Sequence, residues 1–343
     1  MILYKKVAKE WFTAIFISLI CVLLLRTFFF EISVVNSPSM EKSLLTGDFM
    51  FINKLCYGPR LPRTIISVPF VNQKWFSTSM SLSYIRLFGS PDVERNDVVV
   101  FNYPYESEYP IDHRSYFVKR CVAIAGDSLE IMNGQLFVNQ VMIDTLTTLQ
   151  FNYHLKSSKP LDSAFIAHYG LYEGGKISDN NDYSFSLTNA LADTMKSKKH
   201  ITEIGKNSED KTMWDEFTFP YSAHYKWNVD NYGKLKVPKK GDVIKLDSIN
   251  LCFYERIISV YEENTIEFEN DSIYINDKYA PTYQIKQNYY FMMGDNRHNS
   301  QDSRHWGFVP EDHIVGKATR IVFSSDKLFG TGIRWSRIWK KIE

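Results

Sequence analysis

The sequence has few cysteines and no excess of charge of either sign. Only four cysteines occur in 343 residues, and no two of them have Cys-x-x-Cys spacing, which argues against a zinc ribbon or a dithiol redox site. Lys and Arg total 40 against 39 Asp and Glu, so the chain lacks the global basic field typical of nucleic-acid binding. The composition therefore gives no reason to expect a nucleic-acid partner.

The cysteines also limit the possible disulfides. Cys21 lies in an apolar N-terminal run, which leaves Cys56, Cys121 and Cys252 outside it. An odd number allows at most one bridge within the chain. We expect these thiols to be free and buried.

Sustained helical periodicity is scarce except at the N-terminus. Residues Trp11 to Leu25 carry no charge, and after Arg26 the run continues to Phe30, a length close to the ~20 residues that span a bilayer. We expect a transmembrane anchor over residues 9–30. A buried core helix is the alternative. Bulky phenylalanines follow the run where a signal-peptide cleavage site would need small residues, so the segment should be retained.

Lysines on one side of this run predict its orientation. Lys5, Lys6 and Lys9 precede it, and positive flanks stay in the cytoplasm. Residues 1–8 should therefore be cytoplasmic, and the chain from Glu31 onward should be extracytoplasmic.

Short runs of β-branched and aromatic residues dominate the rest of the chain. Gly, Asn, Asp and Pro separate them, as is typical of strands, and 44% apolar content supports a packed core. The runs are 49–52, 98–101, 116–118, 136–138, 273–275 and 289–292. We expect a mainly β fold, with an antiparallel β catalytic domain after the anchor.

A β-rich accessory region is expected inside this domain. Residues 129–139 and 266–276 share one pattern, each reading as a hairpin around Asn-Gly or Asn-Asp. Duplication and chance similarity of hairpins both remain open. Between them, residues 145–237 are polar and irregular, which suggests an inserted segment.

Three polar segments suggest acyl transfer. Ser37-Pro38-Ser39-Met40 supplies hydroxyls, Lys119-Arg120 supplies an amine, and the run 294–307 is too rich in Gly, Asn and Asp for a helix or regular strand. Lys119 interrupts an apolar strand, where burial can lower a lysine pKa by about 3 to 5 units and leave a neutral amine. An outward-pointing Lys119 is the alternative. Strand alternation places Arg120 on the opposite face, where Asp295 or Asp302 could pair with it.

In order and spacing these motifs resemble those of bacterial type I signal peptidases, which are membrane-anchored endopeptidases. The matching segments are the anchor, 34–57, 94–127 and 294–318. They include Ser37–Leu45, Arg95–Phe101, Lys119-Arg120 with Gly126-Asp127, Gly294–Arg297, Asn299–Arg304 and Trp306–Pro310. The sequence departs from the motifs of this family at two positions: Pro38 replaces a glycine and Lys42 replaces a proline. We expect these differences to change the turn around Ser39 and the charge at the edge of the site, and so the fine substrate selectivity.

The resemblance implies a role for each matching residue. Ser39 would be the nucleophile and Lys119 the general base, with Ser39 N–H and the Ser37 hydroxyl as the oxyanion hole. Ser300 would orient Lys119. The ion pairs Asp295–Arg120 and Asp302–Arg304 would hold the loop. Shallow pockets for small side chains would be lined by Val35, Met40, Leu44, Phe117 and Val118.

The implied organisation has six parts: a cytoplasmic N-terminus (1–8), an anchor (9–30), a first catalytic part (31–128), an accessory β-rich region (129–287), a second catalytic part (288–326) and a basic aromatic tail (327–343). The implied substrates are exported proteins carrying signal peptides, cut at the outer side of the cytoplasmic (inner) membrane. No metal or other cofactor is needed. His298, His305 and His313 lack the helical spacing of a zinc protease.

The tail has its own pattern. Trp335, Ile338, Trp339 and Ile342 fall at helical spacing, so the tail could lie on the membrane surface or pack on its own domain.

Two other functions fit parts of the sequence. A self-cleaving serine-lysine protease shares the dyad but needs neither anchor nor polar loop. The chain could instead be a membrane-tethered β-rich binding protein, in which Ser39 and Lys119 would have no catalytic role.

Overall fold

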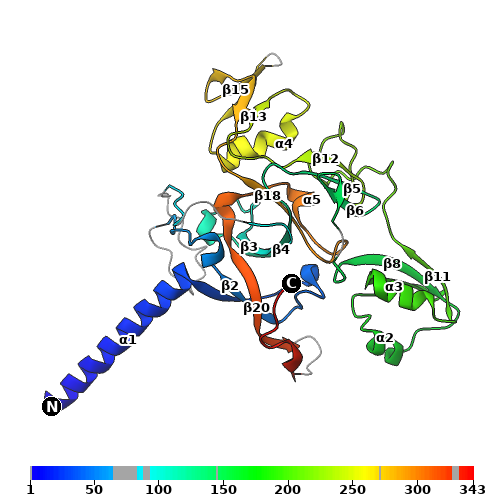
Figure 1. Cartoon of the computed structure of the whole chain (residues 1–343), viewed down its shortest axis with the longest axis horizontal. Helices are drawn as coiled ribbons and strands as arrows, with labels where there is room; N and C mark the ends of the chain where they lie inside the picture. The colour runs from blue at the N-terminus through cyan, green and yellow to red at the C-terminus, as the bar shows by residue number, and fades with distance from the viewer. Residues whose placement is uncertain (1, 65–82, 88–92, 144–145, 270–271, 327–331) are drawn as a thin grey trace.

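The computed structural model describes residues 2–64, 83–87, 93–143, 146–269, 272–326 and 332–343. A long N-terminal helix leads into a body built mainly of antiparallel sheets (Figure 1). The helices are α1 (Ile2–Phe28), α2 (Ser163–Tyr169), α3 (Asn189–Lys196), α4 (Leu251–Arg256) and α5 (Ser303–Trp306), with short 3-10 turns such as η1 (Pro38–Met40) and η7 (Trp335–Arg337).

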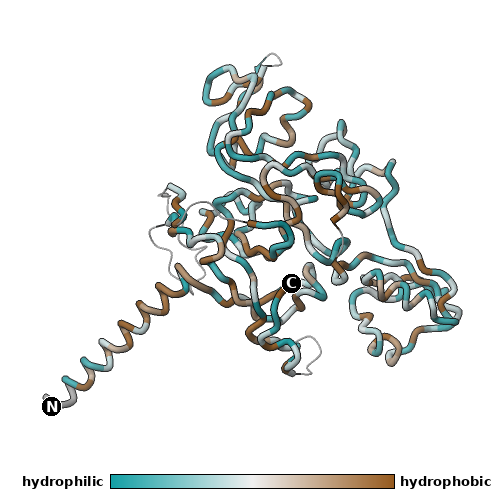
Figure 2. The backbone as a smooth tube through the Cα atoms, viewed as in Figure 1, coloured by the Kyte–Doolittle hydropathy of each residue, from teal (hydrophilic) through white to brown (hydrophobic). Residues whose placement is uncertain are grey.

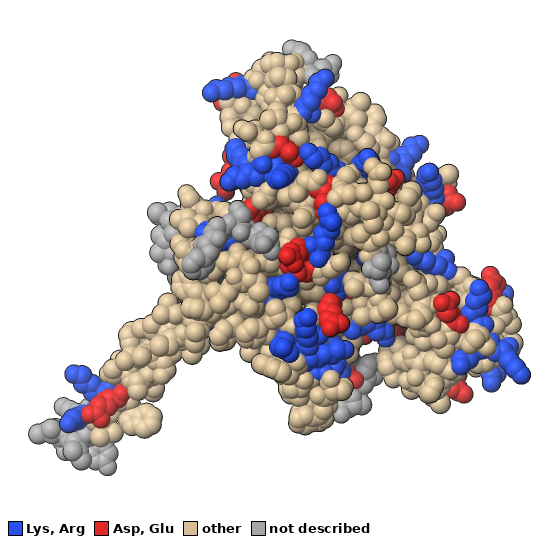
Figure 3. Space-filling model, viewed as in Figure 1, with Lys and Arg blue, Asp and Glu red and all other residues tan. Residues whose placement is uncertain are grey.

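Helix α1 projects from the body (Figure 1) and is apolar along most of its length (Figure 2). Its segment Lys6–Phe28 is long and apolar enough to cross a membrane, and none of that segment's most apolar window is buried against the protein. In Figure 3 charges gather at its free end, whereas its middle carries none. A membrane is the environment in which such a helix would not expose apolar surface to water.

The predicted anchor 9–30 is wrong at its C-terminal boundary. The helix ends at Phe28, and Phe30 already opens strand β1 (Phe30–Val34). Phe30 pairs with Asn53 of β2 (Asp48–Asn53), so ladder hydrogen bonds replace helical ones there. Hydropathy alone could not separate Phe29 and Phe30 from the anchor. The exposed residues at the start of β1, such as Phe30 and Ile32, are as apolar as those of the helix.

The main sheet carries the motifs found in the sequence. Its strand order is β1-β2-β20-β3-β4-β18-β19, with β21 added beside β20. Besides β1 and β2, these strands are β3 (Val98–Asn102), β4 (Tyr116–Ala123), β18 (Tyr289–Met293), β19 (Val309–Pro310), β20 (Ile314–Asp326) and β21 (Gly332–Ile333). All of its pairings are antiparallel. Strand β4 is central, which buries its later residues from both sides.

Residues 128–142 and 232–284 form further small sheets. Strands β5 (Ser128–Met132), β6 (Gln135–Val138), β7 (Val141–Met142) and β12 (Tyr232–Lys236) make one sheet, β13 (Val243–Lys245) pairs with β17 (Thr282–Gln284), and β14 (Ile266–Glu269), β15 (Ser272–Ile275) and β16 (Lys278–Tyr279) make a third. Both echoed segments are therefore antiparallel hairpins.

The segment expected to be polar and irregular contains an ordered unit. We call residues 150–206 the accessory unit. Strands β8 (Gln150–Ser157), β9 (Gly174–Ser178), β10 (Asp182–Thr188) and β11 (Ile201–Lys206) form its sheet in the order β11-β8-β10-β9. Asp162 and Thr188 cap the first turns of α2 and α3. These strands are short and carry many polar residues on their solvent side. The alternation of apolar and polar residues was therefore not recognised in the sequence.

The accessory unit has its own core, made of Leu155, Leu171, Tyr183, Phe185, Leu187, Ala192, Met195 and Ile201. In Figure 1 it lies on the far side of the body from α1. Its first strand nevertheless reaches the main domain, because Gln150 bridges to Asn296 in the polar loop.

The cysteines are free, as expected, but the prediction of burial is wrong for Cys56, which is exposed, whereas Cys121 is buried and Cys252 is half-buried.

Phe185→Ala should test the accessory core. Removing this buried ring should destabilise the unit by about 3 to 5 kcal/mol through lost burial and a residual cavity. Hydrogen exchange should quicken in β8–β11 and stay slow in β3 and β4. Ile177→Ala, at an exposed position of β9, should change stability by less than ~0.5 kcal/mol. Equal loss of protection in β3 and β4 would contradict a separate core.

Candidate active site

Ser39 lies on a single 3-10 turn close to the end of β1. Pro38 opens this turn η1, and Ser37 before it is extended, with φ −133° and ψ 153°, as proline requires of its predecessor. Ser39 is buried, whereas Ser37 is exposed. The Ser37 and Ser39 hydroxyl oxygens are 3.2 Å apart. The turn therefore presents two hydroxyls side by side.

Lys119 reaches this turn from the middle of the main sheet. It lies in β4 between β3 and β18, and only 3% of its surface is exposed. Its Nζ donates to Ser39 Oγ at 2.5 Å. The Phe117 ring, two residues earlier on the same strand, lies 5.5 Å from Nζ. The outward-pointing alternative for Lys119 is thus wrong.

Burial changes the acidity of this amine. Desolvation lowers the pKa of Lys119 to about 8, because a buried ammonium loses its hydration, while the carboxylates of Asp302 and Asp295 act in the opposite direction. A substantial fraction of the lysine is therefore neutral slightly above neutral pH. A neutral amine at hydrogen-bond distance can remove a proton from a hydroxyl.

Arg120 and Asp295 form a buried ion pair on the other face of β4. Each is 1% exposed, and the guanidinium Nε and Nη2 donate to the two carboxylate oxygens at 2.7 Å each. The Ser43 hydroxyl also donates to Asp295, at 2.5 Å. Ser43 follows Ser39 by four residues, so this carboxylate links the serine turn to the polar loop. Sequence reasoning did not identify Ser43.

A second pair shapes the polar loop from within. Arg304 donates to both oxygens of Asp302, at 2.9 and 2.8 Å, and the Gly294 N–H donates to the same carboxylate at 3.0 Å. Burial alone would raise the pKa of Asp302, but Arg304 holds it well below the usual range. A charged Asp302 therefore connects Gly294, at the start of the polar loop 294–307, to Arg304, near its end.

Ser300 does not take the position expected of it. Its hydroxyl donates to the Gln301 carbonyl at 3.4 Å, and the expected hydrogen bond with Lys119 does not form. It packs instead against Gly294, where an added Cβ would lie 2.2 Å from Ser300 Oγ and 2.5 Å from the Ser39 carbonyl oxygen. Glycine at 294 therefore lets the loop approach the serine turn closely.

The residues predicted to line substrate pockets divide into two groups. Val35, Met40 and Leu44 belong to the core beneath the serine turn, where they pack together with Ile342. Phe117 and Val118 are half-buried, and the Phe117 ring stacks on Tyr103 with centroids 4.4 Å apart. Only the second pair lies partly open to solvent.

Asn296 is an important residue that sequence reasoning missed. Its backbone N–H donates to the Ser39 carbonyl at 3.0 Å, and its side-chain amide donates to the Pro38 carbonyl at 3.3 Å and to Glu173 at 2.6 Å. Glu173 belongs to the accessory unit, just before β9. One buried amide therefore joins the serine turn, the polar loop and the accessory unit.

The C-terminal tail supports the serine turn from behind. Arg337 donates to the buried Asp48 carboxylate and to the Ser43 carbonyl. The Glu343 carbonyl accepts from Arg120 at 2.8 Å. The tail packs on its own domain, which is one of the two alternatives that its sequence left open. Turn η7 spans three residues, and the Trp339 and Ile342 N–H groups bond to the Ile321 and Thr319 carbonyls of β20.

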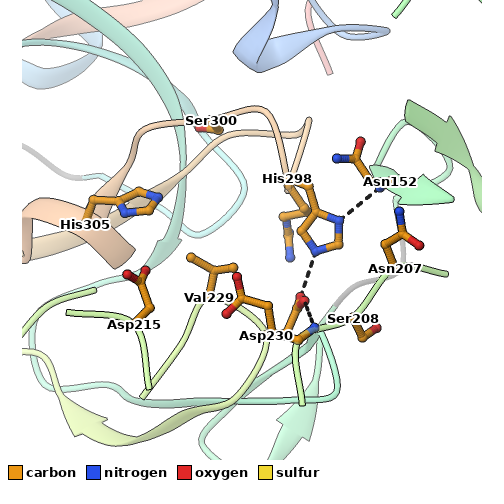
Figure 4. A pocket seen from close by; sticks show the side chains of 11 residues that line it. Asn152, Asn207, Ser208, Asp215, Val229, Asp230, His298, Ser300 and His305 are labelled. Atoms are coloured by element: carbon orange, nitrogen blue, oxygen red, sulfur yellow. Dashed lines mark hydrogen bonds and ion pairs between the residues drawn. The ribbon is translucent and has the colours of Figure 1, made fainter. Parts of the chain in front are cut away.

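The three histidines near the loop have different partners. His298 accepts from the Asn152 N–H at Nδ1 and therefore donates from Nε2 to Asp230, 2.8 Å away. Figure 4 shows this contact beside a pocket of about 460 Å³ that Ser300 and His305 also line. His313 lies against Asp312. Among the described residues no group of three or more His, Cys, Asp or Glu side chains could hold a metal ion.

The family comparison identifies the class of protein as a serine endopeptidase, and the apolar helix α1 fits a membrane anchor. The family described as "Signal peptidase, peptidase S26" matches residues 8–181 and 278–323, which is more than half of the sequence. The chain belongs to this family.

Relatives extend the match over nearly the whole chain. Signal peptidase I of Buchnera aphidicola subsp. Baizongia pistaciae is 26% identical over 343 residues, covering 98% of this chain and 85% of the relative. Signal peptidase I of Aquifex aeolicus is 25% identical, covering 92% and 84%. A crystal structure of a signal peptidase I from Enterococcus faecalis aligns with 67% of this chain and all of its own, at 15% identity and a TM-score of 0.24.

Asp295→Asn should destabilise the protein strongly. The amide keeps the shape but leaves the Arg120 guanidinium buried without a counter-charge, which costs about 3 to 5 kcal/mol. Urea unfolding measures this loss. Arg95→Ala, which removes the more exposed partner of Asp127, should cost less than ~1 kcal/mol. Equal effects of the two substitutions would contradict a special role for the buried pair.

Proposed function

We propose that this chain removes signal peptides from exported proteins, with Ser39 as nucleophile and Lys119 as general base. The observation that carries the proposal is the 2.5 Å contact between a buried lysine amine and a buried serine hydroxyl. Family membership and relatives named signal peptidase I support the substrate class.

The reaction would begin with neutral Lys119 accepting the Ser39 proton as Oγ attacks the substrate carbonyl. The 2.5 Å between Lys119 Nζ and Ser39 Oγ is short enough for a proton to pass from the hydroxyl to a neutral amine. The same distance allows a charged Lys119 to donate a hydrogen bond to the hydroxyl. Lys119 would then give this proton to the leaving amine, and water would hydrolyse the resulting ester. In the tetrahedral intermediate, the Ser39 N–H and the Ser37 hydroxyl would stabilise the oxyanion.

The supporting roles follow from the contacts around the dyad. Arg120 with Asp295, and Arg304 with Asp302, would keep the polar loop in place. Ser300 would act by packing against Gly294. Phe117 and Val118 would contact the residues before the cleaved bond, with Val35, Met40 and Leu44 shaping the floor from below.

The location proposed is the cytoplasmic membrane, crossed once by α1, with the N-terminus inside and the catalytic domain outside. Exposed apolar side chains support a position close to lipid. Phe30 and Ile32 of β1 are exposed, and Trp335 and Trp339 of the tail are 74% and 59% exposed. Tryptophans of this kind favour the membrane interface, which would bring Ser39 near the end of a membrane-embedded signal peptide.

Two competing functions remain distinguishable. A self-cleaving protease would act mainly on its own chain, and a binding protein would cleave nothing. Purified enzyme incubated with a separate preprotein distinguishes all three, because only a signal peptidase yields the mature protein in repeated turnovers.

Ser39→Ala and Lys119→Met should each lower kcat by at least about 10³-fold, since the pair acts as a unit. Turnover of a preprotein, measured by the appearance of mature protein, checks this. Ser158→Ala and Lys236→Met change exposed residues of the same types and should retain activity. Near-normal turnover in Lys119→Met would rule out the proposed base.

The pH dependence follows from the same lysine. Because the base must be neutral, kcat/KM should rise tenfold per pH unit below about pH 8, the pKa of Lys119, and level off above it. Peptide cleavage at constant ionic strength between pH 6 and 10 measures this profile. A rise that continues to pH 10 would indicate an unperturbed lysine and contradict the proposed environment.

A further inference from the structure

Strand β8 of the accessory unit is hydrogen-bonded to the polar loop on both sides of Asn296. The Gln150 N–H donates to the Asp295 carbonyl, and the Arg297 N–H donates to the Gln150 carbonyl, each at 2.9 Å. This pairing is a parallel bridge between Gln150 and Asn296. Asn296 is 0% exposed, so the accessory unit fixes the backbone of a residue that has no contact with solvent.

The side-chain amide of Asn296 lies between two acceptors. Its Nδ2 donates to Glu173 Oε2 at 2.6 Å and to the Pro38 carbonyl at 3.3 Å. A carbonyl and an ionised carboxylate can only accept, so the nitrogen of the amide must face both of them. Asn296 Oδ1 has no hydrogen-bond partner among the described residues. The two donated bonds therefore fix the orientation of this amide.

Glu173 is itself held by the sheet of the accessory unit. The Ser186 N–H of β10 donates to the Glu173 carbonyl at 2.9 Å, and the next residue, Gly174, opens β9. A Cβ at Gly174 would clash with the Ser184 carbonyl oxygen of β10, so glycine allows the two strands to pair closely. The Glu173 carboxylate therefore projects from a fixed backbone.

The Pro38 carbonyl shares a peptide group with the Ser39 N–H. A peptide group is planar and almost always trans, so its C=O and N–H lie in one plane and point in opposite directions. A hydrogen bond to the Pro38 oxygen therefore restricts the direction of the Ser39 N–H. This N–H is the backbone donor of the oxyanion hole in the function proposed above.

We propose that Glu173 is a positioning residue for the oxyanion hole. Through the Asn296 amide it holds the peptide group between Pro38 and Ser39, so that the Ser39 N–H points to where the oxyanion forms. Neither Glu173 nor Asn296 donates to the oxyanion itself. The inference rests on the proposed function and adds to it a contribution of the accessory unit to catalysis.

The experiment uses the full-length enzyme in detergent with a signal-peptide substrate. Glu173→Leu, which cannot accept a hydrogen bond, should lower kcat by about ten- to a hundredfold, the size of effect that small misplacements have. KM should change by less than about twofold, because the donor acts mainly in the transition state. Glu173→Ala should give the same result without the bulk of leucine. Glu173→Gln keeps an acceptor oxygen and should retain kcat within about threefold.

A double-substitution cycle distinguishes this role from a general structural one. Asn296→Ala should lower kcat to a similar extent, and adding Glu173→Leu to it should lower kcat by less than about twofold more, because both act on one carbonyl. Asn228→Ala is the matched control. Asn228 is also 0% exposed, and its amide donates to the Asp210 and Met213 carbonyls. This control should lower stability in urea and leave kcat unchanged.

The pH profile of kcat/KM supplies a further readout. It should still level off near pH 8 in Glu173→Leu, because Glu173 is not among the groups that shift the pKa of Lys119. A displaced profile, unchanged kcat in Glu173→Leu, equal losses in Glu173→Leu and Glu173→Gln, or losses that multiply in the double variant would overturn the positioning role alone. No cleavage by the unaltered enzyme would overturn the proposed function and this role with it.

Discussion

The burial of one amine beside one hydroxyl is the constraint on which this structure depends. Lys119 is charged in water at neutral pH, and placing it in a central strand removes its hydration. The carboxylates of Asp295 and Asp302 exert a field on it, yet each is held by its own arginine. The lysine is therefore near negative charge without being paired to it, which leaves its proton weakly held. Only such an amine can serve as a base near neutral pH.

This arrangement explains why so much of the chain surrounds a short turn. The Ser39 turn has little secondary structure of its own, so neighbouring segments hold it. Asn296 bonds to its carbonyls, Ser43 reaches Asp295, and Arg337 bonds the Ser43 carbonyl. Each contact comes from a segment distant in sequence. The accessory unit joins this network through Glu173, so it contributes directly to the setting of the proposed site.

Local patterns predicted the fold class well and its boundaries less well. Runs such as 98–101 and 116–118 lie within strands because β-branched and aromatic residues fit a buried sheet. The alternation of Lys119 and Arg120 also predicted that they face opposite sides. The end of α1 and the form of the tail could not be predicted, because both depend on pairing with strands far along the chain. Trp339 and Ile342 have helical spacing, but hydrogen bonds to β20 prevail.

The candidate site was predictable where residue identity carries the chemistry. A lysine inside an apolar strand, with a serine segment and a polar loop, suggested the chemistry, but left Asp295 and Asp302 both open as partners of Arg120. The role of Ser39 and the Arg120–Asp295 pair were implied only by the family resemblance. Asn296 and Glu173 could not be found this way, because their importance depends on the accessory unit's position against the loop, which the printed sequence does not encode locally. Ser300 was found by its motif, but the motif did not predict its partner. The expected partner was Lys119, whereas its hydroxyl donates to the Gln301 carbonyl.

The most direct test of this account is the acidity of the Lys119 amine itself. Lysine side-chain NMR of the full-length enzyme in detergent, with Lys119→Met to assign the signal, measures it independently of turnover. The account predicts one amine that titrates near pH 8 and disappears in the variant. If every lysine titrates near the ordinary value of about 10.4, the buried-amine account is contradicted.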